Sequence, residues 1–172
     1  MITNSRSDNV NTRNLVVDIL LAVTRDGAFS HIAIRDVLDK YRYLPKQDRA
    51  FITRLSQGTI ERMIELDAII NQFSKTKVKK MKPVIAAILR SGVYQLKYMD
   101  SVPDSAACNE AVKLTVKRGF GGLKGFVNGV MRTIARNMDQ IRYPDAEKEP
   151  VRYLSVKYSI PEWLVQRFTE QY

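Results

Sequence analysis

Lysine and arginine are the most numerous side chains in this sequence that could bind a ligand, and they are concentrated in its middle. Between Lys75 and Arg142 there are 14 basic and four acidic residues, whereas the remainder of the chain is neutral. The whole formal net charge of +10 therefore lies in this stretch. Such a concentration is typical of proteins that bind a polyanion, because neutralised phosphates release counterions. The alternative is an ordinary solvated surface.

The basic residues follow two spacing patterns. The segment SKTKVKKMK, at 74–82, has five lysines in eight positions and is the densest cluster. Lys124, Asn128, Arg132 and Arg136 instead recur every four residues beside an apolar row. Residues four apart share one face of a helix, so this spacing predicts a basic stripe beside a buried face.

Catalytic chemistry is not supported by the remaining residue types. His31 is the only histidine and Cys108 the only cysteine, which excludes a metal site or triad built from several such residues. Cys108 lies among alanines and is expected to be a buried thiol, and Glu110 has no partner for acid–base work. GFGG, at 119–122, lacks the ending and the preceding strand of a phosphate-binding loop, and a flexible connection is the better interpretation. We expect no catalytic, metal-binding or cofactor-binding residue in this chain.

The candidate nucleic-acid contacts are selected by charge and spacing. They are Arg6, Arg13, Lys75, Lys77, Lys79, Lys80, Lys82, Lys117, Arg118, Lys124, Arg132 and Arg136. Asn109 and Asn128 lie on otherwise apolar helices, where structural hydrogen bonds are favoured over base recognition. Tyr94, Tyr98, Phe120 and Tyr143 could stack on unpaired bases, although core positions are the alternative.

These residues must be positioned by helices. A chain of 172 residues that is 45% apolar and 27% charged is long enough for one domain with a sizeable core. No alternating apolar pattern indicates a sheet, and the apolar spacing predicts an all-α protein. The N-terminus lacks an apolar signal segment and no run approaches 18 apolar residues, so we expect a cytoplasmic protein without a membrane partner.

The first half of the sequence is predicted to contain three helical regions. Asn11 or Thr12 caps the first, which Gly27 ends, although its apolar run VVDILLAV also suits a buried strand. Ser30 caps a second helix that ends near Tyr41. A third region opens with proline at residue 45 and extends to residue 73. Gly58 inside this region indicates either close contact with another helix or a break.

The second half predicts a helix from Pro83 to about Asp100 and two helices around the glycine loop, between residues 102 and 136. A polar segment with two prolines follows and is expected to be a linker. Pro150 then opens a short helix, and Ser159 with Glu162 forms a capping box for a last helix that has no termination signal before Tyr172. The sequence is therefore expected to continue in a longer protein.

Three segments carry a resemblance to a known family. They are DRAFITRLSQGTIERMIELDAIINQF (48–73), VIAAILRSGVYQLKYMDSVPDSAACNEAVKL (84–114) and GFVNGVMRTIAR (125–136). In order and spacing they resemble the RNA-binding fold of the NusB antitermination protein. The resemblance implies a NusB-like helical bundle as an RNA-binding domain over residues 1–138, followed by linker helices over 139–172.

The ending RYLSVKYSIPEWLVQRFTEQY (152–172) resembles the segment that leads to the catalytic domain in the RsmB (Sun, Fmu) ribosomal RNA methyltransferases. This resemblance implies a substrate-docking part of an enzyme that methylates carbon 5 of a cytosine in small-subunit ribosomal RNA. It implies S-adenosylmethionine as cofactor of the parent enzyme, none in this fragment, and a C-terminal methyltransferase domain as partner within the same chain. Cys108 matches neither catalytic motif of that family.

Two other functions stay open at this point. The first is a free-standing antitermination factor of the NusB type, which would bind leader RNA and a small protein. The second is an interaction domain whose basic face meets an acidic protein.

Overall fold

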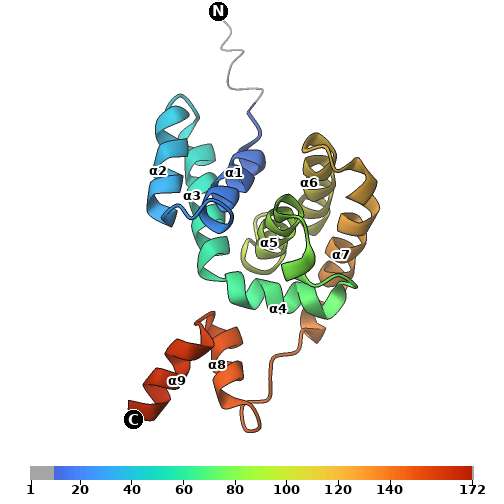
Figure 1. Cartoon of the computed structure of the whole chain (residues 1–172). Helices are drawn as coiled ribbons and strands as arrows, with labels where there is room; N and C mark the ends of the chain where they lie inside the picture. The colour runs from blue at the N-terminus through green and yellow to red at the C-terminus, as the bar shows by residue number, and fades with distance from the viewer. Residues whose placement is uncertain (1–9, 172) are drawn as a thin grey trace, which may run out of the picture.

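The structure of the protein, a computed structural model, describes residues 10–171. This part contains nine α-helices, and the prediction of an all-α protein is confirmed (Figure 1). The helices are α1 Thr12–Thr24, α2 Ser30–Lys40, α3 Lys46–Glu61, α4 Met63–Phe73, α5 Pro83–Tyr98, α6 Asp104–Lys117, α7 Lys124–Arg136, α8 Pro150–Tyr158 and α9 Glu162–Gln171. Three short 3-10 turns lie between them, at Val78–Lys80, Gly121–Leu123 and Met138–Gln140.

Helix α5 occupies the middle of the bundle and contacts α1, α3, α4, α6 and α7 (Figure 1). Pro83 stands in its first turn, where a missing amide hydrogen costs nothing. Small residues let neighbouring helices approach closely: a side chain at Gly92 would overlap the end of Met131 on α7. Most of α5 is consequently buried, which makes it the scaffold for the helices around it.

The N-terminal helices follow the capping signals with one difference. Asn11 caps α1, since its side chain accepts a hydrogen bond from the amide of Asn14 at 3.1 Å. Gly27 adopts a positive φ of 76° just after α1, and the alternative of a strand there is wrong. Ser30 is the first residue of α2 rather than its cap, because Phe29 holds the capping position without a side-chain hydrogen bond.

The third helical region is divided at Arg62, four residues beyond Gly58. Arg62 leaves the helical conformation, with φ −103° and ψ 15°, and α4 begins there in a new direction. Gly58 stays inside α3, where a side chain would overlap the ring of Tyr94 on α5. Of the two interpretations of Gly58, close helix contact is therefore correct.

The C-terminal helices α8 and α9 pack on each other, and α8 contacts α4 (Figure 1). The Gln72 side chain pairs with the backbone of Arg142, accepting at 2.9 Å and donating at 2.7 Å. The hydroxyl of Ser159 accepts a hydrogen bond from the amide of Ile64, at the start of α4. The predicted capping box is therefore wrong: Ser159 caps α4, and the carbonyl of Pro161 accepts the first hydrogen bonds of α9. The domain boundary near residue 138 stays a prediction.

No helix among residues 10–171 has the length and apolar character needed to cross a membrane.

Candidate nucleic-acid interface

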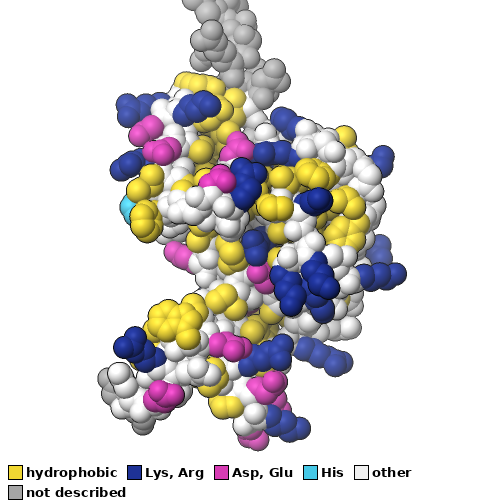
Figure 2. All heavy atoms as spheres, viewed as in Figure 1, with side chains coloured by type: hydrophobic (Ala, Val, Ile, Leu, Met, Phe, Trp, Pro, Cys, Tyr) yellow, Lys and Arg dark blue, Asp and Glu magenta, His cyan; other side chains and the backbone are white. Residues whose placement is uncertain are grey.

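Helices α6 and α7 form the pair that carries the first basic surface. Their inner faces are buried, with Ala107, Cys108, Ala111 and Leu114 on α6 and Val127, Val130, Met131 and Ile134 on α7. Residues a fraction of a turn away are thereby directed to solvent. In Figure 2, basic side chains project along the right-hand edge of the molecule, over these two helices.

Arg132 joins the two helices on their outer face. Its Nη2 donates to Asn109 Oδ1 on α6 at 2.8 Å, and its Nε donates to Asn128 Oδ1 on α7 at 3.3 Å. The three side chains border a hollow of about 530 Å³, together with Val112, Lys113, Lys124 and Gly125. The expectation that both asparagines make structural hydrogen bonds is confirmed, and we call this feature the α6–α7 hollow.

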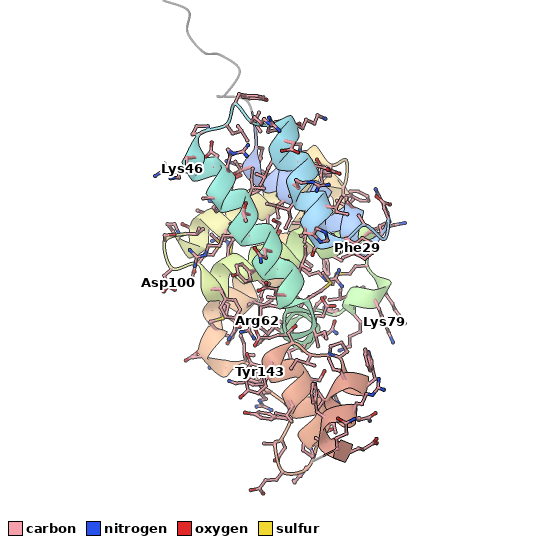
Figure 3. All side chains as sticks on the ribbon, turned by 90° about the vertical axis from the view of Figure 1, so that its left-hand side faces the viewer. Phe29, Lys46, Arg62, Lys79, Asp100 and Tyr143 are labelled. Carbon is pink, nitrogen blue, oxygen red and sulfur yellow. The ribbon has the colours of Figure 1, made fainter. Side chains whose placement is uncertain are left out.

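The five lysines of residues 75–82 form a second basic surface on the connection between α4 and α5, and all five side chains are exposed. Buried Val78 anchors the connection, with its amide donating to Asn71 Oδ1 at 2.9 Å. Lys77 Nζ donates to the Asn71 carbonyl at 3.1 Å, whereas Lys79 projects from the outer edge (Figure 3). Figure 2 shows basic side chains gathered over this connection. The backbone is thus held in place while most of the charge faces solvent.

Two of the predicted contacts are engaged inside the bundle instead. Arg13 is half-buried: its Nε donates to Gln95 Oε1 at 2.8 Å, and its guanidinium lies 5.0 Å from the centre of the Phe51 ring. Burial lowers the pKa of this guanidinium. Arg118 binds Asn14 Oδ1 at 2.7 Å and Asp18 Oδ1 at 2.6 Å, which fixes the end of α6 to α1. We leave both outside the proposed interface.

The remaining predicted contacts differ in position. Lys117 and Arg136 are exposed at the last turns of α6 and α7. Lys124 is exposed at the start of α7, on the α6–α7 hollow. Arg6 lies outside the described residues. The assignment of these residues to nucleic-acid contact stays a prediction.

The aromatic candidates are mostly structural. Tyr98 and Tyr143 both donate to the carboxylate of Glu65, which is only 2% exposed; the bond from Tyr143 measures 3.0 Å. Burial, then the nearby Glu65 carboxylate, raises the pKa of both phenols. Tyr94 packs over Gly58, and Phe120 is half-buried against the core. All four residues are partly buried, which favours the structural alternative over base stacking.

Cys108 is fully buried, as predicted, and burial raises the pKa of its thiol. A raised pKa keeps the sulfur protonated near neutral pH, so it is not a nucleophile there. His31 is an exposed residue in the first turn of α2.

Sequence reasoning missed part of the α6–α7 hollow. Asn109 and Lys113 were not among the candidate contacts, and Asn128 was expected to be structural only. The spacing of four already placed Asn128 in one row with Lys124 and Arg132. Asn109 and Lys113 come from another helix, so only the packing of α6 on α7 reveals their position.

Comparison with known proteins agrees with an all-helical bundle of this kind. A family model described as NusB family matches residues 10–136, so the chain belongs to the NusB family. The transcription antitermination protein NusB of Agathobacter rectalis is 39% identical over 90 residues, which are 52% of this chain and 69% of that protein.

A second group of relatives is longer. The probable ribosomal RNA small subunit methyltransferase B of Bacillus subtilis is 36% identical over 160 residues, 93% of this chain and 35% of that protein. Its counterpart in Synechocystis is 35% identical over 94% of the chain. The chain spans about a third of the length of both.

Solved structures share the fold. A chain in the crystal structure of the antitermination factors NusB and NusE in complex with dsRNA matches with a TM-score of 0.67 and 20% identity, over 78% of this chain and 98% of that one. The crystal structure of PH0851 matches 94% of this chain and 36% of that chain, with a TM-score of 0.69 and 16% identity.

Proposed function

We propose that this chain is the RNA-binding, substrate-docking part of a larger enzyme that methylates carbon 5 of a cytosine in small-subunit ribosomal RNA. The extent of the likeness to the methyltransferase relatives carries this proposal. A match of 160 residues to the B. subtilis protein must continue past residue 136, where the NusB family match ends, into the segment of α8 and α9. That segment contacts α4 directly in this structure.

The charge distribution supports RNA as the ligand. The exposed lysines of the α4–α5 connection and the donors of the α6–α7 hollow suit a phosphate backbone. Small-subunit ribosomal RNA and a following methyltransferase domain are the partners that the proposal implies.

S-adenosylmethionine would be the methyl donor of the larger protein. Among residues 10–171 the glycine loop at 119–122 follows a helix, and no strand leads into it. This part of the chain therefore does not fit a cofactor loop of the strand–loop–helix kind. RNA binding is therefore the only role that we assign to residues 10–171.

A free-standing antitermination factor is the second candidate. It is favoured by the Agathobacter NusB protein, since this chain covers 69% of that relative at 39% identity. Such a factor would bind a leader RNA as a complete protein.

The mass of the native protein separates the two candidates. Antibody raised against this chain should capture, from extracts of the source cells, a protein well above 19.7 kDa. Deleting its gene should remove one 5-methylcytosine from small-subunit ribosomal RNA in bisulfite sequencing, and the full-length gene should restore it. A native mass near 19.7 kDa, or unchanged methylation, would overturn the methyltransferase proposal.

A further inference from the structure

At the α6–α7 hollow, Arg132 determines which amide atoms of Asn109 and Asn128 are left for a ligand. A guanidinium has only hydrogen-bond donors, so the amide atom that faces it on Asn109 and on Asn128 must be the oxygen. Because an amide is planar, fixing each oxygen also fixes the NH2 group on the other branch of the side chain. Both asparagines are exposed. Their NH2 groups therefore remain available to a ligand.

The other groups around the hollow are also donors. Lys113 and Lys124 border it, and none of the described residues that line it is acidic. Glu110 on α6 pairs with Lys113 Nζ at 3.5 Å, and this ion pair is weak in water because the Lys113 side chain is exposed. Gly125 adds no side chain, and a Cβ built there would meet nothing within 4 Å. A ligand can thus approach the first turn of α7 closely.

We propose that the α6–α7 hollow binds a phosphodiester group of an RNA strand. The NH2 groups of Asn109 and Asn128 and the outer edge of the Arg132 guanidinium donate to its oxygens, and Lys113 and Lys124 neutralise its charge. This inference rests on the proposed RNA-binding function and names the group that holds the backbone.

The chemistry favours phosphate over a base. The Watson–Crick edge of every base carries at least one donor, which would find no acceptor among these side chains, whereas phosphate oxygens only accept. The N7 and O6 edge of guanine also only accepts, but it lacks the negative charge that Lys113 and Lys124 would neutralise. Leaving a donor unpaired on binding costs affinity. The hollow therefore positions the RNA backbone without reading its sequence.

Asn128→Asp tests the proposal, because it keeps the side-chain shape and the acceptor for Arg132 while replacing the NH2 donor by a negatively charged oxygen. The matched control is Gln166→Glu at an exposed site on α9, a substitution that changes the net charge equally.

Affinity for a fluorescent single-stranded RNA from the small subunit is measured by anisotropy at several salt concentrations. We expect Asn128→Asp to bind at least about tenfold more weakly, since a charge-assisted hydrogen bond is lost. Its salt slope should also fall by about 0.7, the value for one phosphate contact on a single strand.

Each outcome is informative. If Asn128→Asp binds like Gln166→Glu, the hollow is not a phosphate site, although RNA binding itself stands. If the unaltered chain binds no RNA, the proposed function fails instead. Tighter binding of poly-glutamate than of RNA, with the same dependence on Asn128, would assign the hollow to an acidic protein and overturn the proposal. Should Asn128→Asp melt at a lower temperature, Lys124→Gln decides, because the exposed Lys124 side chain forms no hydrogen bond with another described residue. We expect it to weaken binding several-fold and lower the salt slope.

Discussion

A side chain at Gly58 would overlap the ring of Tyr94, whereas one at Gly129 on α7 would meet nothing within 4 Å. Both glycines lie inside helices, where alanine is otherwise favoured by roughly 1 kcal/mol. We therefore expect Gly58→Ala to lower the free energy of unfolding by about 1–3 kcal/mol. Gly129→Ala should raise it by about 0.5–1 kcal/mol. Urea unfolding measures both. In a Tyr94→Leu background, Gly58→Ala should lower the free energy of unfolding by less than it does in the unaltered chain. An equal loss in both backgrounds would show that overlap with the Tyr94 ring does not cause the destabilisation.

The phenols around Glu65 give the fold a pH dependence. Tyr143 and Tyr98 have raised pKa values in the folded state, so unfolded chains lose these protons at lower pH than folded ones. The stabilisation from this difference is fully present below the unfolded pKa of about 10 and is lost as pH rises above it. Tyr143→Phe removes one such proton. We expect the free energy of unfolding to fall less steeply above pH 10 in this variant than in the unaltered chain. Identical pH profiles by chemical denaturation would contradict a raised Tyr143 pKa.

At the scale of helices, local signals predicted most starts and ends. Pro83, Asn11 and Gly27 act through their own backbone or that of the next few residues, so their effect is readable from the sequence. A break was one of the two interpretations of Gly58, but its position at Arg62 was not predicted. The hydrogen bond from the Ile64 amide to Ser159 was not predicted because it joins segments far apart in the chain. The α7 side of the α6–α7 hollow was predicted, because its residues recur every four positions along one helix. The α6 side was not predicted, because only the packing of α6 on α7 brings Asn109 to the hollow.

Ser159 links two such distant elements and can be tested as a cap. The backbone of Ser159 has a positive φ of 54°. The Ser159 hydroxyl accepts the hydrogen bond from the Ile64 amide at 3.2 Å. Ser159→Ala and Ser159→Gly both remove the acceptor, but only glycine adopts this backbone conformation without strain. We expect both to loosen α8 from α4, with alanine less stable than glycine by about 1 kcal/mol. Faster trypsin cleavage after Arg142 and Lys148, with the alanine variant fastest, would show the loosening. Equal cleavage rates in all three proteins would exclude a capping role.

Arg62 and Tyr143 mark the same boundary between the bundle and the C-terminal helices (Figure 3). The Arg62 guanidinium lies 5.5 Å from the Tyr98 ring centre, and Lys157 of α8 lies 4.9 Å from that of Tyr143. The Lys157–Tyr143 pair links α8 to the preceding segment, and Tyr143 is in turn bound to Glu65 of α4. The Arg62–Tyr98 pair lies within the bundle, but Arg62 Nη1 also donates to the Lys157 carbonyl at 3.4 Å. Helix α8 is thus attached to the bundle at several points, and α9 packs on α8.

For the molecule as a whole, the position of charge should matter more to RNA affinity than its amount. Replacing Lys77, Lys79 and Lys80 by glutamate changes the net charge by the same six units as replacing Arg35, Lys40 and Lys46 on the α2–α3 side. If RNA lies across the α4–α5 connection, the first triple variant loses several phosphate contacts. The second variant changes only the long-range field, which salt screens within about 10 Å at 0.1 M. We expect the first to bind small-subunit RNA at least about a hundredfold more weakly at 0.1 M salt, with a salt slope smaller by about 2.

The control variant should bind within a few-fold of the unaltered chain at the same salt. Anisotropy titrations between 50 and 300 mM salt give both the affinities and the slopes. Equal losses in the two triple variants would mean that net charge alone attracts the RNA. A loss confined to the second would place the RNA on the α2–α3 side, away from both basic surfaces. Only a loss confined to the first is consistent with an RNA path that begins on the α4–α5 connection and continues to the α6–α7 hollow.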